Sequence, residues 1–226
     1  MKHTICRLLV FPVMLIVLIS PAVLVAAQDD EPEGGTALNV ACPAEEELGR
    51  LVDALRAEHP GHEHPPIQGL LWHRDEHFSF FIPIGWQRSD WDDGRASVRY
   101  YPVPDDPQTL FAVEEKDLGM AMSPEDLDRL DAEFVDAIEE LPEAAIELRD
   151  KAVVGEQMRL EYKYTFREGC VVRRRWVRVF FLGTRATTMM AQGSTLDLYD
   201  YWLPWFFEAM ATAQVHYEKP TIASLG

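Results

Sequence analysis

Basic residues are scarce in this chain of 226 residues, which has 21 Lys and Arg against 38 Asp and Glu and a formal net charge of −17. Nucleic acids and anionic membrane surfaces attract proteins of the opposite charge, because their phosphates are neutralised by cations. The composition therefore argues against both as partners. It keeps the chain soluble but names no other partner.

The motifs of several enzyme classes are also absent. The sequence has no C-x-x-C, no H-E-x-x-H and no G-x-S-x-G, the spacings used by thiol oxidoreductases, zinc proteases and α/β-hydrolases. EF-hand spacing is missing too, although acidic pairs occur at Asp92-Asp93 and Asp105-Asp106. We therefore predict no catalytic residue and favour a non-enzymatic protein.

The first 27 residues have the pattern of an export signal. Lys2 and Arg7 precede an apolar run at 8–25, and the small residues Ala26 and Ala27 precede a polar stretch. Cleavage after Ala27 would remove Lys2 and Arg7 and take the formal charge from −17 to −19. The alternative is an uncleaved anchor, since the run is near the lower limit for crossing a bilayer. We predict an exported protein, located in the periplasm, outside the cell or at its surface.

Few cysteines are present, and Cys6 lies ahead of the apolar run. Cleavage leaves Cys42 and Cys170, which an oxidising compartment allows to form a disulfide. Two other states stay open. In the first, both thiols are inert. In the second, Cys42 is reactive, because it lies just before Pro43 at a predicted helix start, where the helix dipole favours a thiolate.

Composition divides the rest of the chain into four parts. An acidic stretch at 28–42 is predicted to be a flexible linker. Region 43–76 is predicted to hold a helix at 43–58, from apolar residues at i, i+3, i+4 and i+7, and then a His- and Pro-rich loop. The main domain is expected at 77–216 and a tail at 217–226.

The main domain alternates between strand and helix patterns. Period-two alternation and turn residues predict seven strands, near 77–82, 96–101, 109–115, 146–154, 157–166, 171–182 and 185–191. A helix opens at Ser123-Pro124, and a final helix spans 195–212 after a capping Ser194. Strands joined by tight turns pair antiparallel, and helices cover the sheet. The predicted fold class is α+β, with an antiparallel sheet of about six or seven strands sandwiched by α-helices.

The final helix is rich in aromatic residues. Its predicted buried face comprises Leu196, Tyr199, Leu203, Phe206, Phe207 and Met210, at helical spacing. Tyr201, Trp202 and Trp205 are then left for a surface. Pro204 is predicted to kink the helix or to mark its true start.

One stretch resembles the opening motif of PsbP-like and DcrB-like domains: Phe78-Ser79-Phe80-Phe81-Ile82-Pro83-Ile84-Gly85-Trp86. The capped helix, the strand into Val154-Gly155, the Glu168-Gly169 hairpin and the aromatic helix follow in that family's order. The resemblance covers residues 77–215. It implies an antiparallel sheet sandwiched by helices, the fold that PsbP shares with the Ran-binding Mog family. It implies no single chemistry or partner.

The densest histidine cluster lies in the loop after the first predicted helix. His59, His62 and His64, with Glu63, are the ligand types that zinc and copper prefer. The loop lacks the fixed i, i+4 geometry of a helical metal site. Two interpretations stay open, a solvated polar loop and a loose surface site for a transition metal.

A predicted hairpin brings basic residues together. If Glu168-Gly169 forms its two-residue turn, Lys163 lies opposite Arg174 and Arg159 opposite Arg178. Glu161 then lies opposite Trp176. Like charges opposed across strands are unfavourable unless a negative group joins them.

The predicted partner-binding or anion-binding face therefore comprises Arg159, Lys163, Arg174, Trp176 and Arg178. In one interpretation the acidic helix at 125–140 neutralises this face. In the other it binds an anion or an acidic partner, with Trp176 stacked on an arginine.

These patterns together predict an exported, non-enzymatic binding or assembly protein of the cell envelope. Its partner is expected to be an envelope protein or a small ligand, with membrane contact only through an uncleaved leader. The alternative is an extracytoplasmic metal-binding protein that uses the histidine loop. No cofactor is expected, apart from a loosely bound transition metal under that alternative.

Overall fold

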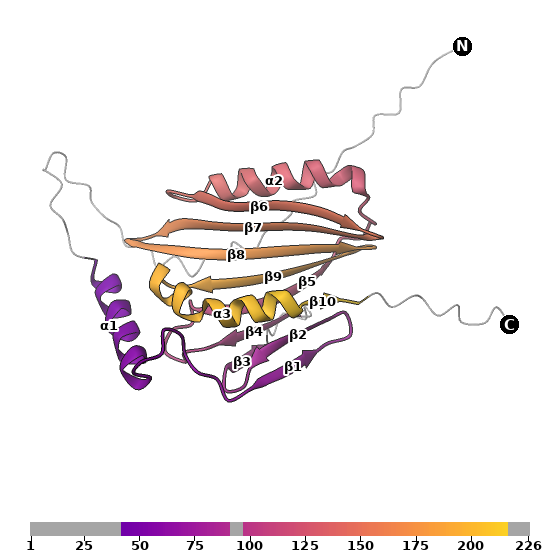
Figure 1. Ribbon diagram of the computed structural model, residues 1–226. Helices are drawn as coiled ribbons and strands as arrows, with labels where there is room; N and C mark the ends of the chain where they lie inside the picture. Colours follow the sequence, from indigo (N-terminus) through magenta and orange to yellow (C-terminus); the bar gives the residue numbers. More distant parts are fainter. Residues whose placement is uncertain (1–41, 91–96, 217–226) are drawn as a thin grey trace, which may run out of the picture. The chain divides into compact units, whose positions relative to one another are not determined.

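The computed structural model describes residues 42–90 and 97–216. The predicted leader at 1–27, nearly all of the predicted linker and the predicted tail at 217–226 lie outside the described residues. The predicted fold class is confirmed, because the described residues form a mostly antiparallel α+β structure with helices on both faces of its larger sheet (Figure 1).

A large antiparallel sheet forms the centre of the fold. Its order is β3 (Gln87–Asp90), β4 (Ser97–Tyr101), β5 (Leu110–Asp117), β9 (Arg185–Gly193), β8 (Val171–Leu182), β7 (Gln157–Glu168) and β6 (Ala145–Val154). Strand β7 alternates polar with large apolar residues, whereas β8 carries large apolar residues on both faces, among them Trp176, Phe180 and Phe181. Both faces of the sheet therefore need cover.

A second, small sheet holds β1 (Leu70–Arg74), β2 (Phe78–Pro83) and β10 (Gln214–Val215), in the order β1-β2-β10. We expected β2 in the main sheet, and this was wrong. The position at the edge of the large sheet belongs to β3, a short exposed strand that the sequence did not predict. Strand β1 was also missed, in a segment taken as a loop, because its largely exposed Leu70-Leu71-Trp72 run has no alternation.

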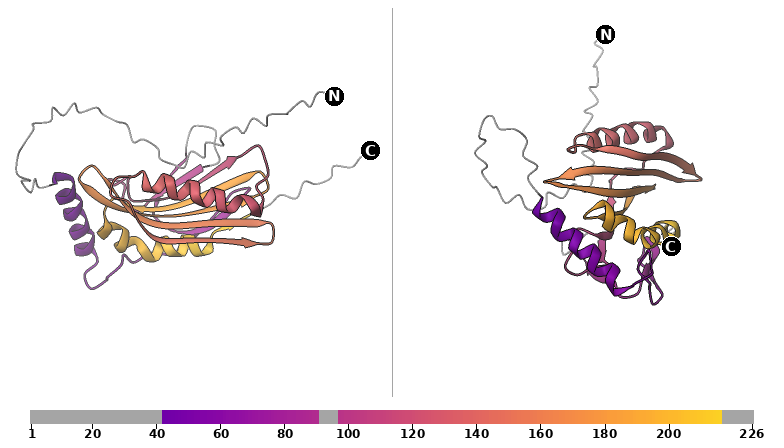
Figure 2. Two further views of the ribbon diagram at one scale, coloured as in Figure 1. Left: turned by 90° about the horizontal axis from the view of Figure 1, so that it is seen from above. Right: turned by 60° about the vertical axis from the view of Figure 1, so that its left-hand side comes forward.

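Helix α2 (Leu127–Glu139) covers one face of the large sheet (Figure 2). It follows a short 3-10 turn, η1 (Pro124–Asp126), where the N–H and hydroxyl of Ser123 both donate to the Asp126 carboxylate. The apolar stripe of α2 is buried, and the Phe134 ring stacks on Tyr162 of β7 with centroids 5.5 Å apart. This contact sets which side of β7 faces the helix.

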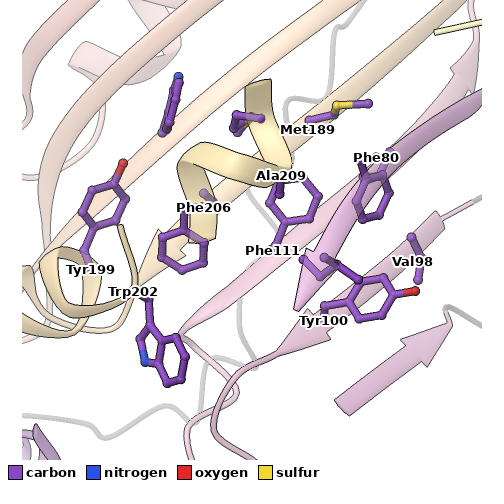
Figure 3. Packing of buried hydrophobic residues seen from close by; sticks show 14 of the residues in the cluster. Phe80, Val98, Tyr100, Phe111, Met189, Tyr199, Trp202, Phe206 and Ala209 are labelled. Carbon is purple, nitrogen blue, oxygen red and sulfur yellow. The ribbon is translucent and has the colours of Figure 1, made fainter. Parts of the chain in front are cut away.

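Helix α3 (Leu196–Thr212) covers the opposite face and also packs against β2 of the small sheet. Its buried side chains join those of both sheets in one apolar core, which includes Phe80, Phe111, Met189 and Phe206 (Figure 3). The helix continues through Pro204. It begins one residue later than predicted, because the Thr195 hydroxyl accepts the Leu198 N–H at 3.1 Å and serves as the N-cap.

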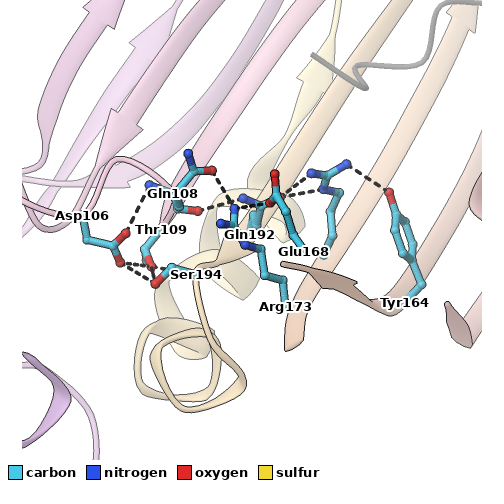
Figure 4. A network of polar contacts seen from close by, with 9 residues as sticks. Asp106, Gln108, Thr109, Tyr164, Glu168, Arg173, Gln192 and Ser194 are labelled. Atoms are coloured by element: carbon cyan, nitrogen blue, oxygen red, sulfur yellow. Dashed lines mark hydrogen bonds and ion pairs between the residues drawn. The ribbon is translucent and has the colours of Figure 1, made fainter. Parts of the chain in front are cut away.

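Ser194, the predicted cap, instead joins a buried polar network (Figure 4). Its hydroxyl donates to the Asp106 carboxylate at 2.7 Å, and the Thr109 hydroxyl donates to the same group at 2.5 Å. These bonds tie the β4–β5 connection to the turn between β9 and α3. Gly193 is required in that turn, because an added Cβ would lie 2.5 Å from the backbone nitrogen of Tyr199.

Helix α1 (Pro43–Glu58) is attached at both of its ends. Cys42, its N-cap, forms a disulfide with Cys170 in the β7–β8 turn, across a sequence separation of 128 residues. Near its other end, the Tyr201 hydroxyl of α3 donates to the Leu55 carbonyl at 3.3 Å. The disulfide, one of the states left open by the sequence, closes a long loop and so restricts the unfolded chain.

The packing of α2 on the sheet can be tested through the pH dependence of stability, because Asp131 of α2 is a buried carboxylate. This carboxylate accepts hydrogen bonds from Arg149, Tyr162 and Lys151. The Arg149 guanidinium is the main cause that lowers the pKa of this carboxyl from 3.8 to about 2.

We expect Asp131→Asn to lower the free energy of unfolding by about 2 kcal/mol at neutral pH. The folded pKa lies below the unfolded one, so this stabilisation is full above pH 3.8 and is lost as the pH falls toward about 2. Urea unfolding of both proteins at several pH values measures the difference. Asp128→Asn, an exposed change on the same helix, is the control. A loss that is equal at pH 7 and pH 2 would contradict the assignment.

Candidate binding site: a groove beside helix α3

The predicted basic residues share the face of the sheet that α3 covers. Arg159 and Lys163 lie four residues apart on the same face of β7. Arg174 and Arg178 lie two residues to either side of Trp176 on the same face of β8. The predicted pairing across the hairpin was wrong by two residues. Trp176 lies opposite Lys163, and Arg178 lies opposite Glu161. A shift of two keeps every side chain on its predicted face.

The two-residue turn explains the shift. Glu168 pairs with Val171, so Gly169 and Cys170 form the turn rather than Glu168 and Gly169. Gly169 has a φ of +59°, which suits the first central position of a tight hairpin turn.

Glu161 neutralises one end of the basic face. Its carboxylate accepts hydrogen bonds from the Trp176 indole and from Arg178, both at 2.8 Å, and Arg159 lies 3.6 Å away. Arg178 also donates to the Met210 carbonyl of α3 and lies 5.7 Å from the Trp176 ring centroid. This arrangement ties the end of α3 to the sheet.

Glu147 of β6 and Asp200 of α3 neutralise the other end. Arg174 lies 2.7 Å from the Asp200 carboxylate and 3.0 Å from that of Glu147. Lys163 is 3.9 Å from Glu147. The sequence had suggested the acidic helix as the source of negative charge, which is wrong. Two α2 carboxylates pair with Arg149 and Lys151 on the opposite face instead.

An open groove of about 540 Å³ lies between α3 and this face. Its floor is a row across three strands, with Leu148 of β6 opposite Lys163 of β7 and Lys163 opposite Trp176 of β8. Three α3 residues and one loop residue complete the lining: Leu203, Pro204, Phe207 and His64. The groove is therefore apolar apart from one lysine and one histidine, as is common in ligand sites.

Two of its apolar side chains are strongly exposed. Phe207 is 58% exposed and Leu148 is 40% exposed, whereas Trp176 in the groove floor is 8% exposed. The sequence-based prediction placed Phe207 in the core, which is wrong, because Phe207 is exposed in the groove. It did not identify Leu148 as a site residue. Trp202, expected to be spare, is buried, and the indole N–H of Trp205 donates to the Pro65 carbonyl at 2.9 Å.

The histidines of the predicted metal site do not converge. The His59 backbone follows α1, and the backbone N–H of His62 donates to the His59 carbonyl at 3.2 Å. His64 Nδ1 lies 3.3 Å from the Tyr201 carbonyl and His64 lines the groove. In the described part of the chain, no group of three or more His, Cys, Asp or Glu is placed to hold a metal. Metal binding at this loop stays a prediction.

Other exposed apolar side chains lie on or beside the small sheet, namely Leu70, Leu71, Trp72 and Ile84, and Trp72 is 55% exposed. Its ring lies 5.7 Å from Phe81 on the neighbouring strand. None of these residues lines the groove.

No protein-family model and no curated protein matches the chain. Solved structures do match it. The cyanobacterial PsbP (CyanoP) of Synechocystis matches over 67% of this chain and 95% of its own, with a TM-score of 0.51 and 16% identity. LpqN, involved in cell envelope biogenesis of Mycobacterium tuberculosis, matches over 74% and 97%, with a TM-score of 0.46 and 14% identity. A Pseudomonas aeruginosa protein of unknown function matches over 67% and 99%, with a TM-score of 0.43 and 15% identity.

The match to CyanoP gives the class: the chain has a PsbP-like fold, as the sequence resemblance implied. At such low identity the likeness concerns the fold and assigns no function. None of the helices in residues 42–90 and 97–216 is both long and apolar enough to cross a membrane.

The ion pair between Arg178 and Glu161 allows a prediction about the stability of the fold. Replacing Arg178 with Gln leaves the Glu161 carboxylate buried with one partner fewer, and we expect it to lower the free energy of unfolding by about 2 kcal/mol. Arg88→Gln, which removes an exposed pair with Asp90, is the matched control and should cost less than about 1 kcal/mol. Urea unfolding measures both. Equal effects of the two changes would contradict a structural role for Arg178.

Proposed function

We propose that the chain is an exported binding protein of the cell envelope, and that its PsbP-like domain holds an apolar part of another envelope component in the groove beside α3. One observation carries the proposal. Phe207 and Leu148 expose apolar surface in a groove of about 540 Å³ whose floor includes Trp176. Apolar clefts of this size are typical of sites that bind a partner or ligand.

Two features support export. The leader at 1–27 has a charged start, an apolar run and small residues before a polar stretch. Cys42 and Cys170 form a disulfide, and disulfides persist mainly in oxidising compartments outside the cytoplasm.

The lining of the groove favours binding over catalysis. Its polar members are Lys163 and His64, and His64 Nδ1 lies within hydrogen-bonding distance of the Tyr201 carbonyl. A hydrolytic site needs a nucleophile within reach of a base, with donors placed for the developing charge. The remaining lining residues have apolar side chains, which suit contact with an apolar partner.

Site-specific photo-crosslinking in the native cell tests the proposal. A photoreactive phenylalanine analogue at Phe207 should form an adduct with a component of the envelope fraction. The same analogue at Ala132, an exposed position on α2, should not form that adduct. Adding Leu148→Asp to the Phe207 variant should reduce the adduct several-fold, because it replaces an apolar side chain of the groove floor, opposite Lys163, with a carboxylate.

The same preparation tests export. The protein recovered outside the cytoplasm should begin at Gln28 if the leader is cleaved, or keep the leader as an anchor in the membrane fraction. Retention in the cytoplasm would contradict export. Identical adducts from Phe207 and Ala132, or none from Phe207, would contradict the groove as the binding site.

A further inference from the structure

Lys163 is the one formally charged side chain among the described residues that line the groove, and it has little pairing there. Its ammonium has three N–H donors. Within residues 42–90 and 97–216 its nearest carboxylate is that of Glu147 at 3.9 Å, beyond hydrogen-bonding distance. The same carboxylate lies 3.0 Å from Arg174, so its interaction with Arg174 is the stronger one.

Tyr199 packs beside Lys163 but does not line the groove. The Lys163 ammonium lies over its ring, 5.2 Å from the centroid. Tyr199 is fully buried, and its hydroxyl has no hydrogen-bond partner among the described residues. Lys163 is therefore the donor that the groove itself presents, and its ammonium favours an acceptor on the ligand.

The rest of the groove is apolar and extends along α3. From Leu203 to Phe207, the α3 residues that line the groove, the helix rises about 6 Å. Over that length Leu203 and Phe207 face Leu148 and Trp176 across the groove. A cavity of about 540 Å³ suits one small ligand. The Lys163 ammonium and the apolar walls together define an amphiphilic site.

Resting on the proposed function, we infer that the occupant of the groove is a single-chain amphiphile with a carboxylate head, such as a free fatty acid. The carboxylate accepts hydrogen bonds from Lys163, and the chain lies along Phe207 and Trp176. A carboxylate is preferred to a neutral head because charge-assisted hydrogen bonds are about twice as strong as neutral ones.

The negative net charge of the protein does not prevent such binding. Interactions between exposed charges are screened beyond about 8–10 Å at physiological salt. The head group contacts Lys163 at a much shorter distance, where the apolar walls of the groove reduce the screening. Burial of the chain supplies affinity that is independent of charge.

Calorimetric titration of the mature protein tests the inference with three probes: dodecanoate and dodecyltrimethylammonium below their micelle concentrations, and dodecanol below its solubility limit. Dodecanoate should bind at least about fivefold more tightly than dodecanol, and the cationic probe most weakly. Lys163→Gln should reduce the preference for dodecanoate to about onefold, and Lys163→Arg should keep it. Phe207→Ser should weaken both dodecanoate and dodecanol by about tenfold.

Lys116→Gln is the matched control, because Lys116 is an exposed lysine on β5 outside the groove. It should change none of the affinities. Equal binding of dodecanoate and dodecanol, or a preference that survives in Lys163→Gln, would overturn the inference. Failure of both probes to bind, with a protein adduct still formed at Phe207, would overturn it and leave the proposed function standing.

Discussion

The packing of α3 against two sheets is the interaction on which the rest of the structure depends. One side of this helix buries Leu198, Tyr199, Phe206 and Met210 in the core shared with β2, β8 and β9. That contact is close because Gly193 has no Cβ to meet the Tyr199 backbone. The buried network of Asp106, Thr109 and Ser194 fixes the turn that leads into the helix. The position of α3 therefore follows from a few sterically demanding residues.

The groove is a geometric consequence of that position. A helix is about 10 Å wide and strands lie about 4.8 Å apart, so one helix covers about two strands. Helix α3 packs on β8 and β9, while α2 covers β6 and β7 from the other face. The α3 side of β6 and β7 is thus left without a helix, and Leu148 and Lys163 lie there. The ion pairs of Glu161 and Glu147 stabilise the basic residues around this uncovered surface.

Local patterns were enough to predict most elements, but not the site. The alternation along β7 and β8 predicted the shared face of Lys163 and Trp176, because the period of a strand is two even when the register is uncertain. Phe206 and Phe207 are adjacent in the sequence, and each fits the helical spacing of the predicted apolar face. Which of the two is buried depends on how α3 packs on the sheets. A register shift between Ile146 and Leu148 sets the face of Leu148, and nothing in the local sequence signals it. The small sheet was missed because β1 is short and exposed and β10 has two residues. Strand β3, at the edge of the large sheet, was missed because it too is short and exposed.

The indole N–H of Trp176 offers the most direct test of the groove as an open apolar site. This group donates to Glu161 and Trp176 forms part of the groove floor. Its NMR signal can be assigned with Trp176→Phe and followed while dodecanol is added. An open apolar groove should give a saturable shift of the Trp176 signal, while the signal of the exposed Trp72 on β1 stays unmoved. A saturable shift of Trp72 with Trp176 unchanged would contradict it.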